Sequence, residues 1–558
     1  MNFTLLSDPL LLLIMAMAGF VSMCTSLQVA TRPAAVKTGH VTTALTLGQL
    51  VFIVTRFGNM FYLPLLGNYV DQATRTGNTS LLMQQVQWVV VASASGALVA
   101  LLCLPSFVGL CAHAVHSIYL RGVVRAGLNF VTSKKAWGKA VGSLRRPSLM
   151  GTSLTNLEGV PPKFLIANIF ASAIWTVGAL AAITVSGLSP EVKQTALLLS
   201  GLVNSFAAIT FSIWVDPQAA VITDQAVKGE RPEKHVTIAA VQLILGNFVG
   251  GLLGLVALSP AVSLVTAGAA SIGHTAAKMD TAMGYLIACN AFVLLLLGSI
   301  YSSRVSAVTT RQMASALAVF NFFSLVARIS GQAAAPFIGA VTDSLTHRPP
   351  HTALPPEALA KLEFFYRGLI GGSTVGCILS VLMIPTFVKV YEVAIESLQR
   401  NNGSLSSVLF KGLHPRNWGR ILGLFTAPWK QHVSRAALAS LPKSFLWANV
   451  IVLGFMTVGQ LAAIYAGATF SPELARTTTL LSPLINGIAT ITLSVLVDPT
   501  CARLVDQARE GKRSLEEIET MTFWLAIGSV VGTAVSQLLF LPGAMLISHG
   551  AQLLDRVL

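Results

Sequence analysis

Long apolar runs recur along the whole chain, and they constrain its fold more than any other feature. Runs of about 18 residues or more are each long enough to cross the hydrocarbon core of a bilayer as a helix. Only 11% of the 558 residues are charged, whereas an ordinary soluble domain carries roughly 25% charged residues. The sequence therefore predicts an all-α fold, a polytopic transmembrane helical bundle.

The apolar runs predict twelve spans, six in each half of the chain. The first run follows Asp8 and has no basic residue before it, so we expect a retained helix and not a cleavable signal peptide. In the first half the expected spans lie near 9–30, 41–66, 86–112, 163–187, 192–215 and 236–258. In the second half they lie near 282–301, 313–340, 366–392, 443–469, 474–497 and 520–546.

The basic residues predict the topology. A net charge of +15 would suggest a nucleic-acid partner in a soluble protein, but here the basic side chains gather in loops, where they fix orientation and meet anionic lipid headgroups, so no nucleic acid is expected. The positive-inside rule places the segments after the third and ninth spans in the cytoplasm. Alternation from there puts both termini outside and gives the two halves the same orientation, as parallel repeats.

The second half repeats motifs of the first. We therefore expect two six-helix transmembrane repeats, in residues 1–275 and 276–558. The matched pairs include Thr31-Arg32 with Ser303-Arg304, Arg56 with Arg328, Pro64 with Pro336, Asp71 with Asp343, Thr176-Val177-Gly178 with Thr457-Val458-Gly459, Asn204 with Asn486, and Asp216-Pro217 with Asp498-Pro499.

Arg56 and Arg328 lie inside the second and eighth spans, where a charge is costly unless it faces protein or a wet cavity. A guanidinium offers a planar fork of donors that matches phosphate oxygens, so both arginines are candidates for binding a phosphate or pyrophosphate. A structural arginine paired with a carboxylate of a neighbouring helix is the alternative. Further polar side chains share the two arginine faces at helical spacing: Gln49 and Asn59 with Arg56, and Asn321, Ser324 and Gln332 with Arg328.

Four aspartates are candidates for gating or proton coupling. Asp71 and Asp343 lie just beyond the expected outer ends of their spans, where a solvated helix end is the alternative. Asp216 and Asp498 each precede a proline where the fifth spans of the repeats meet the cytoplasm, and an aspartate followed by proline reads most simply as a helix stop.

Asn204 and Asn486 are further substrate-binding candidates, although such residues in membranes more often bond helix to helix. The six cysteines are scattered without metal-ligand spacing, and we expect neither a metal nor a cofactor. The chain also lacks GxxxxGK[ST], HExxH, GxSxG and DDxxD-type motifs. These absences favour transport over enzyme chemistry.

Thr31-Arg32, a helix with Arg56, Pro64 and Gly67, and the later Ser200, Asn204, Asp216-Pro217, Asp224 and Gly229 resemble the Amj family of bacterial membrane proteins. The resemblance covers nearly all of both halves, although the family pattern is a single six-span module. It implies an alternate flippase for lipid II, the undecaprenyl-pyrophosphate-linked peptidoglycan precursor, in the bacterial inner membrane.

On this hypothesis the chain carries lipid II from the inner to the outer leaflet, and the arginines bind its pyrophosphate in a cationic cavity that both halves line. Cell-wall synthesis enzymes are further candidate partners. Three alternatives stay open: a flippase for another polyprenyl-linked saccharide or for bare polyprenyl phosphate, an ion-coupled small-solute antiporter, and a scaffold that recruits cell-wall enzymes through its basic loops.

Overall fold

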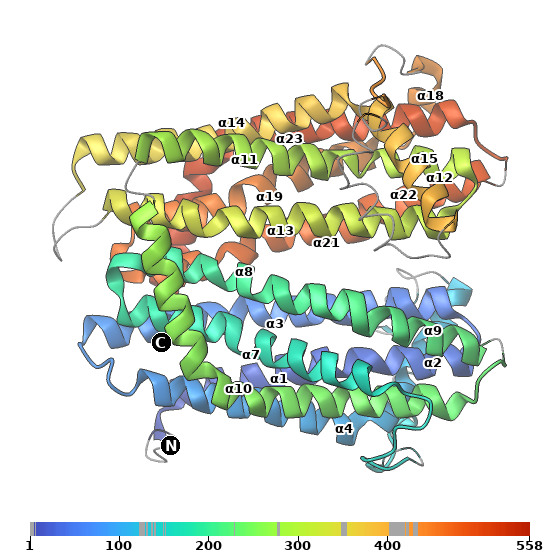
Figure 1. Cartoon of the computed structure of the whole chain (residues 1–558), viewed down its shortest axis with the longest axis horizontal. Coiled ribbons are helices and arrows are strands. Elements are labelled where there is room, and N and C mark those ends of the chain that lie inside the picture. Colours follow the sequence, from blue (N-terminus) through green and yellow to red (C-terminus); the bar gives the residue numbers. More distant parts are fainter. Residues whose placement is uncertain are drawn as a thin grey trace. The chain divides into compact units, whose positions relative to one another are not determined.

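A computed structural model describes the greater part of the chain (Figure 1). The described residues are 5, 7–121, 126, 129, 132–134, 138, 141–148, 150, 152–227, 229–275, 279–346, 354–400, 419, 423–427, 433–509 and 511–557. Within these ranges a number of helix residues, Gln49 and Arg56 among them, have only their backbone described. Every regular element of the described residues is a helix, which confirms the all-α prediction.

The chain divides into two compact units. Unit 1 consists chiefly of Met1–Ala270. Its main helices are α1 (Pro9–Leu27), α2 (Thr31–Thr38), α3 (Val41–Arg75), α4 (Leu82–Arg121), α7 (Pro162–Leu188), α8 (Lys193–Thr210), α9 (Asp216–Val227) and α10 (Glu233–Thr275).

Unit 2 consists of Ser271–Arg556. Its helices follow the same order as those of unit 1: α11 (Met279–Ser299), α12 (Ser302–Thr310), α13 (Met313–Thr346), α14 (Pro356–Leu382), α15 (Ile384–Arg400), α18 (Arg435–Ser440), α19 (Lys443–Thr469), α20 (Ala475–Leu480), α21 (Ser482–Thr492), α22 (Asp498–Arg509) and α23 (Leu515–Val557).

Helices suit this sequence because lipid offers no partners to backbone N–H and C=O groups, and a helix pairs them within one segment. Among the stretches with described side chains, ten are long and apolar enough to cross a membrane. They confirm a multi-pass membrane protein. α3 and α13, which carry Arg56 and Arg328, contain side chains outside the description and are not among the ten.

Small residues let helices within each unit approach closely. In unit 1, α1 packs against α4 with Gly96 facing the backbone oxygen of Gly19, and a Cβ at Gly96 would overlap that oxygen. In unit 2, α11 packs against α14, and Gly376 faces the backbone oxygen of Ala291 in the same way. Such packing replaces the hydrophobic effect as the force that joins helices in lipid.

An asparagine fastens α7 to α10 and another fastens α19 to α23. The side-chain nitrogen of Asn168 donates to the backbone oxygen of Leu243 at 2.9 Å, and that of Asn449 donates to Leu525 at 2.8 Å. In unit 2 the hydroxyl of Tyr301 also donates to Oδ1 of Asn449 at 3.1 Å. Hydrogen bonds of this kind add directional contacts to helix packing in the membrane.

The predicted ninth span, 366–392, is wrong in its bounds. α14 begins at Pro356 and ends at Leu382, and α15 begins at Ile384 after a break at Met383. The break precedes Pro385, which has no N–H to continue the helix ladder. Its counterpart Pro105 lies inside the unbroken helix α4, so the same proline interrupts the span in one unit and not in the other.

Candidate functional site

Helix α13 presents a polar face around Arg328. Arg328 and Asn321 are exposed, and Gln332 is partly buried. Ser324, on the same face, is buried. Arg328 makes no hydrogen bond or ion pair with any residue whose side chain the structure describes. The pairing with a neighbouring carboxylate that sequence reasoning left open is therefore not found for Arg328 in the described part of the chain.

The corresponding face of α3 is described only in part. Asn59 is partly buried, while the side chains of Arg56 and Gln49 lie outside the described residues. The roles predicted for these residues, and the prediction that both arginines line one cavity, stay predictions.

Asp71 and Asp343 lie inside α3 and α13, not beyond the ends of these helices. The side chain of Asp71 is fully buried and that of Asp343 is 5% exposed. Each takes part in a polar interaction within the structure. The expected alternative of a solvated helix end is therefore wrong, because the helices extend further than the apolar runs and pack these carboxylates against their neighbours.

The structure joins Asp216 and Asp498 to arginines that sequence reasoning did not select. Nη2 of Arg32 on α2 lies 2.9 Å from Oδ1 of Asp216, and Nη2 of Arg304 on α12 lies 3.5 Å from Oδ1 of Asp498. In both pairs the arginine is mostly buried, at 16% and 15% exposure, while the aspartate is 54% exposed. The two units thus hold the same ion pair.

A five-residue π-helical turn precedes each of these aspartates, at Phe211–Val215 and at Leu493–Val497. The Asp216 N–H donates to the oxygen of Phe211, and the Asp498 N–H donates to that of Leu493. The helix then continues through the proline, so the helix stop predicted at each Asp-Pro is wrong. The wider turn shifts the hydrogen-bond register just before a residue that has no N–H to donate.

The environment of Asp498 disfavours its charge. Although its side chain is 54% exposed, the removal of its other part from water raises the pKa of Asp498 above its ordinary value, and the attraction of Arg304 opposes this rise only in part. Nη1 of Arg304 is buried and has no hydrogen-bond partner among the described residues. This pair is therefore a poor source of stability, a common property of ion pairs that are partly removed from water.

Asn204 on α8 and Asn486 on α21 share an unusual feature. The side-chain oxygen of each is buried and has no hydrogen-bond partner in the described structure. Each oxygen lies against a glycine of the neighbouring helix, Gly178 on α7 or Gly459 on α19. A buried acceptor without a partner costs about 1–3 kcal/mol, and the same cost in both units calls for an explanation.

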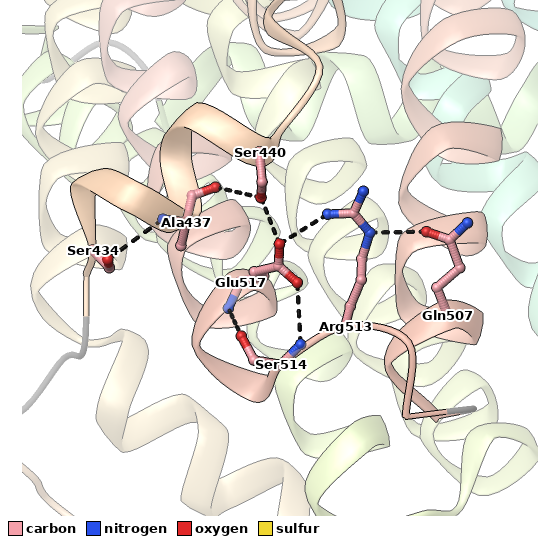
Figure 2. A network of polar contacts seen from close by, with 7 residues as sticks. All are labelled: Ser434, Ala437, Ser440, Gln507, Arg513, Ser514 and Glu517. Atoms are coloured by element: carbon pink, nitrogen blue, oxygen red, sulfur yellow. Dashed lines mark hydrogen bonds and ion pairs between the residues drawn. The ribbon is translucent and has the colours of Figure 1, made fainter.

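A polar network joins three elements at the start of α23 (Figure 2). Ser514 and Glu517 form a capping box, in which the Ser514 N–H donates to Glu517 Oε2 at 3.1 Å and the Glu517 N–H donates to Ser514 Oγ at 3.2 Å. Glu517 also accepts from Ser440 on α18 at 2.5 Å and from Arg513 at 3.1 Å. Arg513 in turn donates to Gln507 on α22 at 2.8 Å.

Unit 1 uses different residues at the start of α10. There Lys234 Nζ lies 2.6 Å from Glu158, and His235 Nε2 lies 3.4 Å from the same carboxylate oxygen. Hydrogen bonds from Lys234 and then His235 lower the pKa of Glu158 below its ordinary value. Both units therefore neutralise an acidic side chain beside the last long helix, at the end that the positive-inside rule assigns to the cytoplasm.

The arginine and amide groups described above are of the kind that bind anionic oxygens. Among the described residues, no group of three or more His, Cys, Asp or Glu side chains is arranged to hold a metal ion. Sequence reasoning missed Arg32, Arg304, Gly178 and Gly459, although all four fall in motifs that repeat between the halves.

Comparison with known proteins gives one family twice. The family described as Amj, alternate to MurJ, matches residues 17–269 and again residues 290–551. A curated relative, the lipid II flippase Amj of Bacillus subtilis (strain 168), is 34% identical over 259 residues, which cover 93% of that protein and 46% of this chain. No solved structure matches the chain. Two copies of the family pattern fill most of the sequence, and the chain belongs to the Amj family.

Proposed function

We propose that this protein is a flippase, a transporter that carries lipid II from the cytoplasmic to the outer leaflet of the bacterial inner membrane. The family and the name of the B. subtilis relative support this substrate. The observation that carries the mechanism is Arg328 on the polar face of α13, an exposed guanidinium that has no carboxylate partner among the residues whose side chains the structure describes. A charge kept at such a position in a membrane helix is typical of a substrate pathway.

The polar faces of α3 and α13 bind the headgroup in this proposal. Arg328 and its counterpart Arg56 bind the pyrophosphate, because a guanidinium fork matches two phosphate oxygens. The amides of Gln49, Asn59, Asn321, Gln332, Asn204 and Asn486 donate to the remaining phosphate and sugar oxygens. The prenyl tail stays in lipid, so that only the polar part of the molecule needs a wet path.

The ion pairs Arg32–Asp216 and Arg304–Asp498 act as gates on the cytoplasmic side. Each links a short helix, α2 or α12, to a helix that follows a π-helical turn, and such turns occur frequently at functional sites. Because both aspartates are 54% exposed, opening either pair costs little, on the order of the 0–1 kcal/mol that surface ion pairs contribute. The buried Asp71 and Asp343 hold the far ends of α3 and α13 in place.

The proposal also includes the extent of the two repeats and their orientation in the membrane. Each repeat is one six-helix module, with the boundary near residue 275, and both termini face outward. Cell-wall synthesis enzymes that use lipid II on the outer side are its proposed partners.

The test is lipid II flipping by the full chain in proteoliposomes, with folding verified by size-exclusion chromatography. Arg56→Ala and Arg328→Ala should each lower the rate at least tenfold, and Arg328→Lys should recover only part because it lacks the fork. Arg400→Ala is the matched control, since Arg400 is exposed on α15 and, among the described residues, forms its ion pair with Glu396 one turn away. Full activity in both alanine variants would refute the role of the arginines.

The same vesicles separate the substrate classes. Lipid II, undecaprenyl pyrophosphate and undecaprenyl phosphate share the tail and differ in the headgroup. Faster transport of bare undecaprenyl phosphate than of lipid II would replace the proposed substrate with the bare carrier lipid.

A further inference from the structure

Each unit holds an asparagine whose carboxamide lies over a glycine of the adjacent helix. In unit 1 the helices are α7 and α8, which pack side by side, and the residues are Gly178 and Asn204. In unit 2 the helices are α19 and α21, and the residues are Gly459 and Asn486. The arrangement occurs twice in one chain, so it is not an accident of one helix contact.

The glycine is required for the carboxamide to take this position. A Cβ built at Gly178 would overlap the side-chain oxygen of Asn204 and lie 3.0 Å from its Cγ. A Cβ at Gly459 would overlap the oxygen of Asn486 and lie 2.7 Å from its Cγ. Any side chain at either glycine would force the asparagine to turn away, because an atom at that distance cannot be accommodated without movement.

The two ends of each carboxamide differ in exposure. The oxygens of Asn204 and Asn486 are buried against glycine, and both residues are partly exposed overall. Their amide nitrogens are not among the buried unpartnered atoms and make no hydrogen bond in the described structure. Each residue thus turns its acceptor inward and keeps its amide nitrogen partly exposed, and Nδ2 of Asn486 also lies 3.1 Å from a Cβ built at Gly459.

A comparison with Asn168 and Asn449 excludes simple helix fastening. These two asparagines lie on α7 and α19, the same helices as the glycines, and their amide nitrogens donate to the backbone of α10 and α23. Asn204 and Asn486 do not use their nitrogens in this way. An asparagine that fastens helices spends its donors on the neighbouring helix, whereas these two keep them available.

We infer that Gly178 and Gly459 are positioning residues, which orient Asn204 and Asn486 so that their N–H donors face an acceptor-rich, anionic lipid headgroup. The inference rests on the proposed function and deepens it, because it assigns the polarity of the site. Two outward donors suit phosphate oxygens and sugar carbonyls, whereas an outward carbonyl would suit a cation.

The contact itself is tested by thermal unfolding of the full chain in detergent. Gly178→Ala and Gly459→Ala should lower the melting temperature, and the double variants Gly178→Ala/Asn204→Ala and Gly459→Ala/Asn486→Ala should recover it, because the overlapping atoms are gone. Gly454→Ala is the matched control on α19, since a Cβ there meets its nearest heavy atom at 3.6 Å. The absence of recovery in both double variants would overturn the positioning role.

The donor role is tested by substitution with aspartate, which has the same shape, fits over the glycine and offers no N–H. Asn204→Asp and Asn486→Asp should each weaken binding of undecaprenyl pyrophosphate and lower lipid II flipping by about tenfold, as expected for the loss of a charge-assisted hydrogen bond. The double variants with alanine at glycine and asparagine should be stable but transport no faster than Asn204→Ala or Asn486→Ala alone.

The outcomes separate this inference from the proposed function. Full transport by the aspartate and alanine variants of both asparagines would show that the glycines serve packing alone, and would overturn the donor role. If the wild-type chain binds undecaprenyl pyrophosphate but does not flip lipid II, the proposed function fails, while weaker binding by Asn204→Asp would still support the donor role.

Discussion

Units 1 and 2 keep some polar contacts in common and differ in others. Both units contain the arginine–aspartate pair beyond a π-helical turn and the asparagine over a glycine. They differ in other polar contacts between helices. In unit 1 the hydroxyl of Tyr69 on α3 donates to Oδ2 of Asp8, at the start of α1, at 2.7 Å. Nε2 of Gln85 on α4 donates to the same hydroxyl at 2.7 Å.

Unit 2 has instead a charged contact between α14 and α23. Arg367 donates to Glu363 at 2.8 Å and to the backbone oxygen of Gln537 at 3.1 Å, and Gln537 donates back to the oxygen of Arg367 at 2.9 Å. The two contacts thus join different pairs of helices in the two units. The shared contacts lie along the path that we propose for the headgroup, which suggests that transport constrains them in both halves.

The close helix contacts should give the largest effects. Gly96→Ala and Gly376→Ala place a Cβ on a backbone oxygen that cannot rotate away, so each should destabilise its unit by about 3 kcal/mol, the upper end of the usual cost of overpacking. Thermal unfolding in detergent measures this. Similar losses in both variants support equivalent packing of α1 on α4 and of α11 on α14, and a loss in only one would break the equivalence.

The Arg367 contact of unit 2 should affect stability more than transport. Arg367→Ala removes two hydrogen bonds from a half-exposed side chain, so we expect a loss of about 1 kcal/mol after allowance for solvent screening. Counted from the matched glycines Gly96 and Gly376, its counterpart is Gln87, and Gln87→Ala should cost less. A flipping rate reduced tenfold in Arg367→Ala with unfolding unchanged would move Arg367 from the structural contacts to the transport path.

The shared ion pairs should affect transport more than stability. Asp216→Asn and Asp498→Asn should change stability by no more than about 0.5 kcal/mol at pH 7, because a partly buried pair gains little from its charge. Both should alter the rate of lipid II flipping, measured in proteoliposomes. Unchanged flipping in both variants would contradict the gating role.

The pH dependence should be the smallest effect and should differ in sign between two carboxylates, Asp498 beside Arg304 and Glu158 beside Lys234. The raised pKa of Asp498 means that its contribution to stability is present at low pH and is lost as pH rises through that pKa. The pKa of Glu158 is lowered, so its contribution is present above the ordinary glutamate value and is lost as pH falls through the lowered value.

Unfolding of Asp498→Asn and Glu158→Gln beside the wild type from pH 7 to pH 4 measures these contributions. The free energy of unfolding of the wild type should rise relative to that of Asp498→Asn as the pH falls. Its excess over that of Glu158→Gln should shrink toward the low end of this pH range. The same trend in both comparisons would show that the two carboxylates share one environment.

Much of the fold follows from the sequence, because each apolar run must form a helix in lipid. The repeat placed Arg32 and Asp216 in matched motifs, but it did not show that the two residues meet, since 184 positions separate them in sequence. The depth of Asp71 was misjudged because hydropathy marks where a run ends and not where the helix ends. The break at Met383 was unpredictable, since Pro105 at the matching place leaves α4 continuous.

The π-helical turns also bear on the history of the gene. Such a turn holds one residue more than the α-helix around it, and so records an insertion. Its presence at Phe211–Val215 and at Leu493–Val497, each directly before an Asp-Pro, is explained most simply by one insertion that preceded the duplication. A single-copy relative that branched off before the duplication should then carry the same extra residue, and its helix should widen at the same place.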